Sequence, residues 1–224
     1  MIKLVIFDMD GLLLDSERNL YLKYGLEVST ELGMPIEAEF LRSMMGNNWG
    51  LYETRIGEHM GKSFPIGEYM RRINEKIFYT VRNEAIPLRP GAKEVLDYCR
   101  KEGYLMAIAT STPRDVASCC LRNAGIEPYF DFIITGDEVT NGKPNPEIYL
   151  RVVDHFSMKK DETVVLEDGH NGSQAAFSAG IPVIIVEDLA YLTDEDRRKA
   201  ALYTFDILDA IAYLRRDRET AAGL

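Results

Sequence analysis

Four short polar segments, each expected at the end of a β-strand, carry the residues that can do chemistry. They read FDMDG (residues 7–11), ATST (109–112), GKPNP (142–146) and LEDG (166–169). Together they supply carboxylates, hydroxyls and one lysine. These groups bind hard metal ions and the oxygens of a phosphate ester.

The carboxylates Asp8, Asp10 and Asp168 predict an oxygen-rich site of the kind that Mg²⁺ prefers, with water and phosphate as the remaining ligands. One carboxylate can attack phosphorus and form a covalent intermediate. Lys143 and the hydroxyl and amide groups of ATST can neutralise and orient the phosphoryl oxygens. Phosphoryl transfer needs this arrangement, because its catalysis rests on positioning and charge stabilisation.

Each segment also has an ordinary structural explanation when it is taken alone. An Asp-x-Asp pair after a strand is often only a turn, and a hydroxyl residue before a helix is often only its cap. Lys143 is typical of a solvated loop lysine, and Glu167 with Asp168 of an acidic pair that complements a helix dipole. Their joint occurrence, in this order and at strand ends, favours a functional site.

The elements that position these segments alternate along the chain. Short apolar and β-branched runs predict strands at residues 3–7, 104–110, 132–135, 163–167 and 182–186. Helices are predicted at residues 93–103, 114–125, 146–156 and 172–180, and after residue 206. This alternation predicts an α/β fold with a doubly wound, mainly parallel, Rossmann-like sheet.

Residues 16–86 interrupt the alternation, because their apolar residues recur at helical spacing. We therefore predict a Rossmann-like catalytic core of residues 1–15 and 87–224 and an inserted helical cap domain of residues 16–86. An insert directly after the first strand lies above the carboxyl ends of the strands, where α/β sheets bind ligands. It is placed to act as a lid that excludes water and selects the substrate.

Composition limits the partners and the compartment. The 224 residues, 46% of them hydrophobic, can bury their own core, which is consistent with a monomer. The net charge of −10 argues against nucleic acid and anionic membranes, and leaves a small phosphorylated metabolite as the expected partner. Three cysteines without a CxxC spacing, and no signal peptide or membrane-spanning run, predict a cytoplasmic protein.

The segments, extended to FDMDGLLLDSE, ATST, GKPNPEIY and EDGHNGSQAAFSAG, resemble the haloacid dehalogenase (HAD) superfamily of aspartate-nucleophile phosphotransferases. The resemblance covers nearly the whole chain, and the motifs are specific as a set. The helical insert is similar to the cap of the branch that contains beta-phosphoglucomutase and many sugar-phosphate phosphatases.

This resemblance implies a role for each matching residue. Asp8 would be the nucleophile, and Asp10 the general acid that protonates the leaving oxygen and later deprotonates the attacking water. Asp8, the Asp10 backbone carbonyl and Asp168 would hold Mg²⁺, with Glu167 as an outer or water-mediated ligand. The groups that would bind the transferred phosphoryl group are Thr110, the Ser111 amide and Lys143.

The same resemblance separates the branches of the superfamily. Asp10 argues against dehalogenation, because the dehalogenases lack an acid two residues after the nucleophile. Phosphonoacetaldehyde hydrolases use a cap lysine, and the matching segment MGNNWG (residues 45–50) has none. Beta-phosphoglucomutases carry a histidine and an arginine in the cap. An ungapped alignment places Leu20 at the position of the histidine, and Asn48 or Trp49 at the position of the arginine. This favours water as the phosphoryl acceptor.

Substrate recognition is expected from the cap and the mouth of the site. Asn47 and Asn48 can hydrogen-bond sugar hydroxyls, and Trp49 can either stack on a sugar face or belong to the cap core. Where many relatives have Ser or Thr after the acidic pair, this chain has Gly169. His170 follows, as either a substrate contact or a solvated or capping residue. Further candidates are Arg18 and Arg55.

The sequence thus predicts a Mg²⁺-dependent phosphatase of small phosphorylated metabolites, most directly sugar phosphates, that forms an aspartyl-phosphate intermediate. The alternative is a sugar phosphomutase, which needs a bisphosphate activator and yields an isomer. A third hypothesis is a non-catalytic binding protein that kept the fold. The intact set of Asp8, Asp10, Lys143 and Asp168 argues against it.

Overall fold

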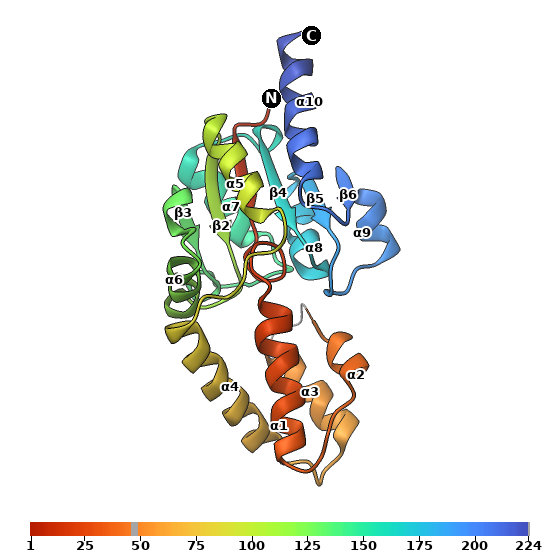
Figure 1. Ribbon diagram of the computed structural model, residues 1–224. Coiled ribbons are helices and arrows are strands. Elements are labelled where there is room, and N and C mark those ends of the chain that lie inside the picture. Colours follow the sequence, from red (N-terminus) through yellow and green to blue (C-terminus); the bar gives the residue numbers. More distant parts are fainter. Residues whose placement is uncertain (46–48, 224) are drawn as a thin grey trace.

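A computed structural model describes residues 1–45 and 49–223, and its centre is a six-stranded parallel sheet (Figure 1). The strands lie in the order β3-β2-β1-β4-β5-β6. Their bounds are β1 Leu4–Phe7, β2 Leu105–Ala109, β3 Phe132–Ile134, β4 Thr163–Glu167, β5 Val183–Val186 and β6 Leu202–Thr204. The predicted α/β fold with a parallel sheet is confirmed, and β1 occupies a central position.

The central strands are apolar along their whole length because both faces of the sheet are covered. Every residue of β1, β4 and β5 is buried, as expected of parallel strands between two layers of helices. Phe7 pairs with Ile108 of β2 and with Leu166 of β4. The carboxyl ends of these three strands therefore meet at one edge, and the polar segments that follow them come together there.

Two layers of helices cover the sheet. Helices α5 (Ala92–Lys101), α6 (Arg114–Asn123) and α10 (Asp209–Ala222) contribute to the apolar cluster that contains Val5 and Phe7. Helices α7 (Glu147–Phe156) and α8 (His170–Ala179) contribute to the cluster that contains Leu4 and Ile6. The remaining elements of this part are α9 (Asp194–Lys199) and the single turns Glu127–Tyr129, Gly136–Glu138 and Lys160–Glu162.

The helices between β1 and α5 lie beyond the carboxyl ends of the strands (Figure 1). They are η1 (Glu17–Leu22), α1 (Lys23–Glu31), α2 (Ala38–Arg42), α3 (Trp49–Met60) and α4 (Ile66–Asn83). The chain enters and leaves this group through two adjacent segments, in which Leu14 bridges to Leu88 and the Asp15 amide donates to the Pro87 carbonyl at 2.9 Å. The division into a core and a cap at residues 15/16 and 86/87 stays a prediction.

The predicted strands and helices match the structure to within about two residues at most of their ends. Besides the three single turns, the helix α9 and the edge strand β6 lack a prediction. Helix α9 (DEDRRK) has no apolar residue to form a helical pattern, and β6 (LYT) lacks the run of apolar β-branched residues that marks the other edge strand, β3 (FII). Within the described ranges, none of the helices is both long and apolar enough to cross a membrane.

The central position of β1 makes a direct test possible. Leu4 is 0% exposed, so we expect Leu4→Ala to lower the free energy of unfolding by about 2–5 kcal/mol, because it leaves a cavity between sheet and helices. Denaturant unfolding measures this change. The control Leu51→Ala replaces a leucine that is 42% exposed on α3, and should change stability by less than about 0.5 kcal/mol. Equal effects of the two substitutions would contradict the packing described here.

Candidate active site

Lys143 and Asp8 form a buried ion pair at the edge of the sheet where β1 ends. The Lys143 ammonium lies 2.5 Å from Asp8 Oδ1 and 2.6 Å from Glu167 Oε1, and it also donates to the Ala109 carbonyl at 2.9 Å. Its side chain is only 5% exposed. The loop before α7 thus delivers one positive charge to the carboxyl ends of β1, β2 and β4.

The charges at this edge shift one another's ionisation. Burial alone would lower the pKa of Lys143, but the carboxylates of Asp8 and Glu167 outweigh it and hold that pKa well above its ordinary value. For Asp8, burial is the largest cause and raises the pKa to about 8, against the opposing effect of Lys143. Lys143 therefore keeps its proton, whereas Asp8 needs further positive charge to be fully ionised at neutral pH.

Three buried carboxylates form a cluster that fits a divalent cation. Oxygens of Asp8, Glu167 and Asp168 all lie within 4.8 Å of one another. Asp168 Oδ2 is buried without a hydrogen-bond partner among the described residues. Burial, and then the nearby charges of Glu17, Glu167 and Asp8, raise the pKa of Asp168. An oxygen-only donor set with an excess of negative charge is what Mg²⁺ and similar hard cations prefer.

Asp10 lies beside this cluster, and its carboxylate accepts hydrogen bonds from the segment that follows β2. Its Oδ2 accepts from the Thr112 hydroxyl at 2.7 Å and from the Thr110 hydroxyl at 3.4 Å. The Thr110 hydroxyl in turn accepts from the Thr112 backbone amide at 3.1 Å. The segment after β2 therefore holds the Asp10 carboxylate at a fixed position.

The structure brings most of the predicted site residues to one place. Thr110 is buried and Lys143 lies within the carboxylate cluster, whereas Ser111 is exposed. Gly136 packs against Ser111, since a Cβ at Gly136 would lie 2.2 Å from the Ser111 carbonyl oxygen. The roles assigned to these residues stay predictions, but their proximity is what a phosphate-binding site needs.

A family model for haloacid dehalogenase-like hydrolases matches residues 5–186. The chain belongs to this family. The match includes all four polar segments and the helices between the first two. It confirms the resemblance found in the sequence and the prediction of an enzyme that hydrolyses its substrate.

Known relatives of this HAD-like chain include several phosphatases. A phosphorylated carbohydrates phosphatase of Thermotoga maritima is 37% identical over 79% of this chain and 81% of its own length. Hexitol phosphatase B of Escherichia coli is 28% identical over 81% of this chain and 82% of its own. These relatives bear out the prediction of a phosphatase.

A solved Thermotoga maritima structure, provisionally named beta-phosphoglucomutase, is 30% identical to this chain with a TM-score of 0.78. The match covers 96% of this chain and 99% of that one. The arrangement of sheet and helices in this HAD-like protein is thus shared along almost its whole length.

Three residues of the site carry no assigned role in the sequence prediction. The Tyr149 hydroxyl donates to Glu167 Oε1 at 2.7 Å, and its ring lies 5.1 Å from the Lys143 ammonium. Thr112 binds Asp10, and Glu17 is buried near Asp168. All three lie inside the motifs GKPNPEIY, ATST and FDMDGLLLDSE. Their position within a motif was the sequence feature that could have identified them as site residues.

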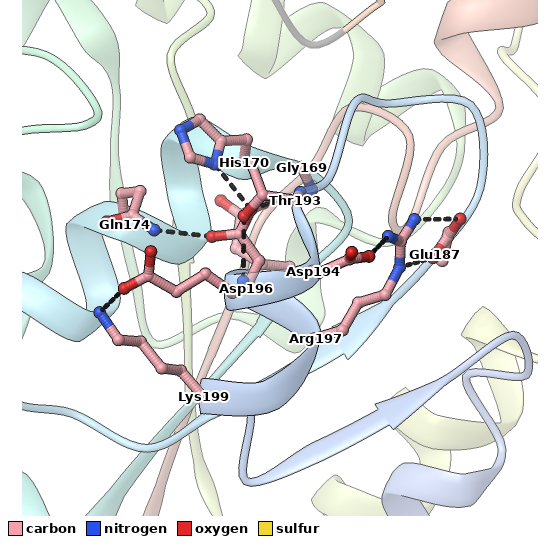
Figure 2. A network of polar contacts seen from close by, with 11 residues as sticks. Gly169, His170, Gln174, Glu187, Thr193, Asp194, Asp196, Arg197 and Lys199 are labelled. Carbon is pink, nitrogen blue, oxygen red and sulfur yellow. Dashed lines mark hydrogen bonds and ion pairs between the residues drawn. The ribbon is translucent and has the colours of Figure 1, made fainter.

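His170 is tied to the last part of the core. Figure 2 shows its ring directed at Asp196, with Nδ1 2.7 Å from Asp196 Oδ2. Asp196 also accepts from Gln174 at 2.6 Å and from the Thr193 hydroxyl at 2.7 Å. These contacts join the start of α8 to α9. These contacts give His170 a structural role, and its contact with substrate stays a prediction.

The predicted recognition residues of the helical insert fall mostly outside the part of the chain whose side chains are described. Asn47, Asn48 and the Trp49 side chain lie outside the described residues. Arg18 is placed: its guanidinium donates to both oxygens of Asp188, at 2.6 and 2.5 Å. That ion pair joins η1 to the loop after β5, so Arg18 connects the helical insert to the sheet.

Two glycines allow the carboxylates to close around the site. Gly11 has a φ of +81°, and a Cβ there would lie 2.1 Å from Asp168 Oδ2. A Cβ at Gly172 would lie 1.6 Å from Glu167 Oε1. Any side chain at either position would have to displace a carboxylate of the cluster.

We expect Gly172→Ala to push Glu167 away from Lys143, because the new methyl group occupies the carboxylate's position. The activity should fall about 10²-fold, as for a displacement of about 1 Å in an active site. The free energy of unfolding should fall by about 1–3 kcal/mol.

Gly57→Ala is the matched control. This glycine also lies within a helix, but a Cβ there would meet no atom within 4 Å. Its substitution should raise stability by up to about 1 kcal/mol through helix propensity and leave activity unchanged. Steady-state kinetics and denaturant unfolding measure both effects. Full activity of the Gly172 variant would contradict the described packing.

Proposed function

We propose that this protein is a Mg²⁺-dependent phosphatase of small phosphorylated carbohydrates that forms a phosphoryl intermediate on Asp8. The observation that carries the proposal is the buried ion pair of Lys143 and Asp8 beside the carboxylates of Glu167 and Asp168. A buried lysine next to a nucleophilic carboxylate and a cation site matches the needs of a transferred phosphoryl group.

Asp8 attacks phosphorus, so that a bond forms between its carboxylate oxygen and phosphorus while the bond from phosphorus to the leaving oxygen breaks. Asp10 donates its proton to that oxygen. In the second step Asp10 takes a proton from water, whose oxygen attacks the same phosphorus and releases phosphate and Asp8. Thr110, the Ser111 amide and Lys143 neutralise and orient the phosphoryl oxygens in both steps.

Asp8, the Asp10 backbone carbonyl and Asp168 are proposed to hold Mg²⁺, with Glu167 outside them. The cation supplies positive charge that keeps Asp8 ionised and offsets the charge of the phosphoryl group. Support comes from the short distances within the cluster and from the unpartnered oxygen of Asp168.

The helices of residues 16–86 are proposed to form a cap domain that closes over the site, with residues 1–15 and 87–224 as the catalytic core. The paired segments at Asp15 and Pro87 are suited to act as its hinge. The carbohydrate class of the substrate rests on the names of the relatives from Thermotoga maritima and Escherichia coli. Asn47, Asn48, Trp49 and His170 are the proposed recognition residues.

The first test measures phosphate release from a panel of sugar and polyol phosphates, with Mg²⁺ and with a chelator. We expect release only with Mg²⁺, and a loss of at least about 10³-fold in Asp8→Asn, because no nucleophile remains. Asp97→Asn is the control, since it changes an exposed carboxylate that pairs with Lys93 on α5. Equal activity of Asp8→Asn and the control would exclude the covalent mechanism.

Binding of Mg²⁺ can be tested without activity. At 100 times its dissociation constant, Mg²⁺ should raise the free energy of unfolding by about 2.7 kcal/mol. We expect this gain to be lost in Asp168→Asn. Without the cation that variant should be at least as stable as the wild type, because it removes one of several buried negative charges. Thermal unfolding with and without Mg²⁺ measures both effects, and an unchanged gain in the variant would place the cation elsewhere.

The similar proteins do not favour the alternative of a sugar phosphomutase, although one solved structure among them is provisionally named beta-phosphoglucomutase. Isomerisation of a hexose phosphate in the presence of a sugar bisphosphate, without release of phosphate, would favour it. Phosphate release from the same hexose phosphate would favour the phosphatase.

A further inference from the structure

Tyr149 contacts two charged groups of the candidate site, and the proposed chemistry gives it no role. It lies in the first turn of α7, and it is 0% exposed. Its hydroxyl donates to Glu167 Oε1 at 2.7 Å, and the centre of its ring lies 5.1 Å from the Lys143 ammonium nitrogen. A substitution by phenylalanine therefore removes the first contact and keeps the second, because the ring alone attracts the ammonium group.

All three N–H groups of Lys143 have partners in the protein. An ammonium group carries three donors. Those of Lys143 go to Asp8 Oδ1 at 2.5 Å, to Glu167 Oε1 at 2.6 Å and to the Ala109 carbonyl at 2.9 Å. The ammonium group is therefore saturated, and it must give up one of these hydrogen bonds before it can donate to a phosphoryl oxygen.

Glu167 is a partner that keeps another side-chain donor when the ammonium group leaves. Its Oε2 accepts from the backbone amides of Asp168 at 3.0 Å and Gly169 at 3.3 Å, and Tyr149 gives Oε1 a second donor. Without Lys143, the carboxylate would thus still have a donor on each oxygen. This matters because Glu167 is 3% exposed, and a buried carboxylate oxygen without a donor is strongly destabilising.

We propose that Tyr149 is a positioning residue that makes Lys143 available to the phosphoryl group of the substrate. The Tyr149 hydroxyl keeps Oε1 of Glu167 paired when the ammonium group moves from that oxygen to a phosphoryl oxygen. The bond from Lys143 to Asp8 stays in place and holds the positive charge beside the nucleophile. The inference rests on the proposed function, in which Lys143 binds the transferred phosphoryl group.

The Tyr149 hydroxyl should matter in one state of the site and not in the other. When the site is free of phosphate, Lys143 stays bound to Glu167, so loss of the hydroxyl leaves Oε1 with a donor. When phosphate is bound, the same loss leaves Oε1 with none. Tyr149→Phe should therefore weaken the binding of phosphate but not that of Mg²⁺, whereas general damage to the site would weaken both.

Inorganic phosphate, the product of the proposed reaction, is the probe. With saturating Mg²⁺, we expect Tyr149→Phe to raise the dissociation constant of phosphate about 10-fold or more, because a buried carboxylate then lacks a donor in the bound state only. The dissociation constant of Mg²⁺ without phosphate should change less than about threefold. Isothermal titration calorimetry measures both constants.

Tyr69→Phe is the matched control. Tyr69 is also 0% exposed, and its hydroxyl donates to the Gly25 carbonyl at 3.2 Å, between two helices of the insert. Its substitution should leave both dissociation constants within about threefold of the wild-type values. Thermal unfolding shows whether both variants remain folded.

A double substitution tests the route through Glu167. A neutral amide without a donor is less destabilising than a carboxylate without one. In the Glu167→Gln background, Tyr149→Phe should therefore change the dissociation constant of phosphate by less than about threefold. An effect as large as in the wild-type background would place the action of Tyr149 elsewhere.

Three results would overturn the inference. They are an unchanged affinity for phosphate in Tyr149→Phe, a parallel loss of affinity for phosphate and Mg²⁺, and the same loss in Tyr69→Phe.

Lys143→Met separates this inference from the proposed function. Weaker phosphate binding in Lys143→Met, without loss in Tyr149→Phe, would keep Lys143 as the phosphoryl ligand and remove Tyr149 from its positioning. Phosphate binding that Lys143→Met leaves unchanged would reject the proposed role of Lys143 and the inference together.

Discussion

The buried ammonium of Lys143 is the interaction on which the rest of this site depends. It lies within 2.6 Å of two carboxylates from different strands, in a position where it is 5% exposed. Without it, the carboxylates of Asp8, Glu167 and Asp168 would meet with no positive side chain among them, and buried like charges repel strongly. One lysine does not balance the cluster, and the remaining negative charge is what makes the place suitable for a divalent cation.

The parallel sheet explains why these charges meet at all. Strands β1, β2 and β4 are adjacent and in register, so the residues that follow them emerge at one edge. The strands themselves are stable because both faces are covered by apolar helices. The buried strands thus stabilise the fold, and the segments that follow them carry the reactive groups.

The helical insert also contacts a loop at this edge of the sheet. Arg18 joins it to Asp188 after β5. This contact comes from the π-helical turn at the start of the insert. A site built between the sheet and these helices can therefore depend on where the insert lies, which is a physical basis for a lid.

The sequence by itself determined the fold class and the family, because β-branched runs, helical periodicity and motif order are local properties of the chain. It also named Asp8, Asp10, Lys143 and Asp168 as candidate site residues. It did not predict β6 or α9, because α9 (DEDRRK) has no apolar residue to form a helical pattern and β6 (LYT) lacks a run of apolar β-branched residues. Only the tertiary structure decided which groups touch: the Tyr149 hydroxyl and Glu167, the Thr112 hydroxyl and Asp10, and the His170 ring and Asp196. These contacts join residues far apart in sequence, and their geometry follows from the packing of whole elements and not from any local pattern.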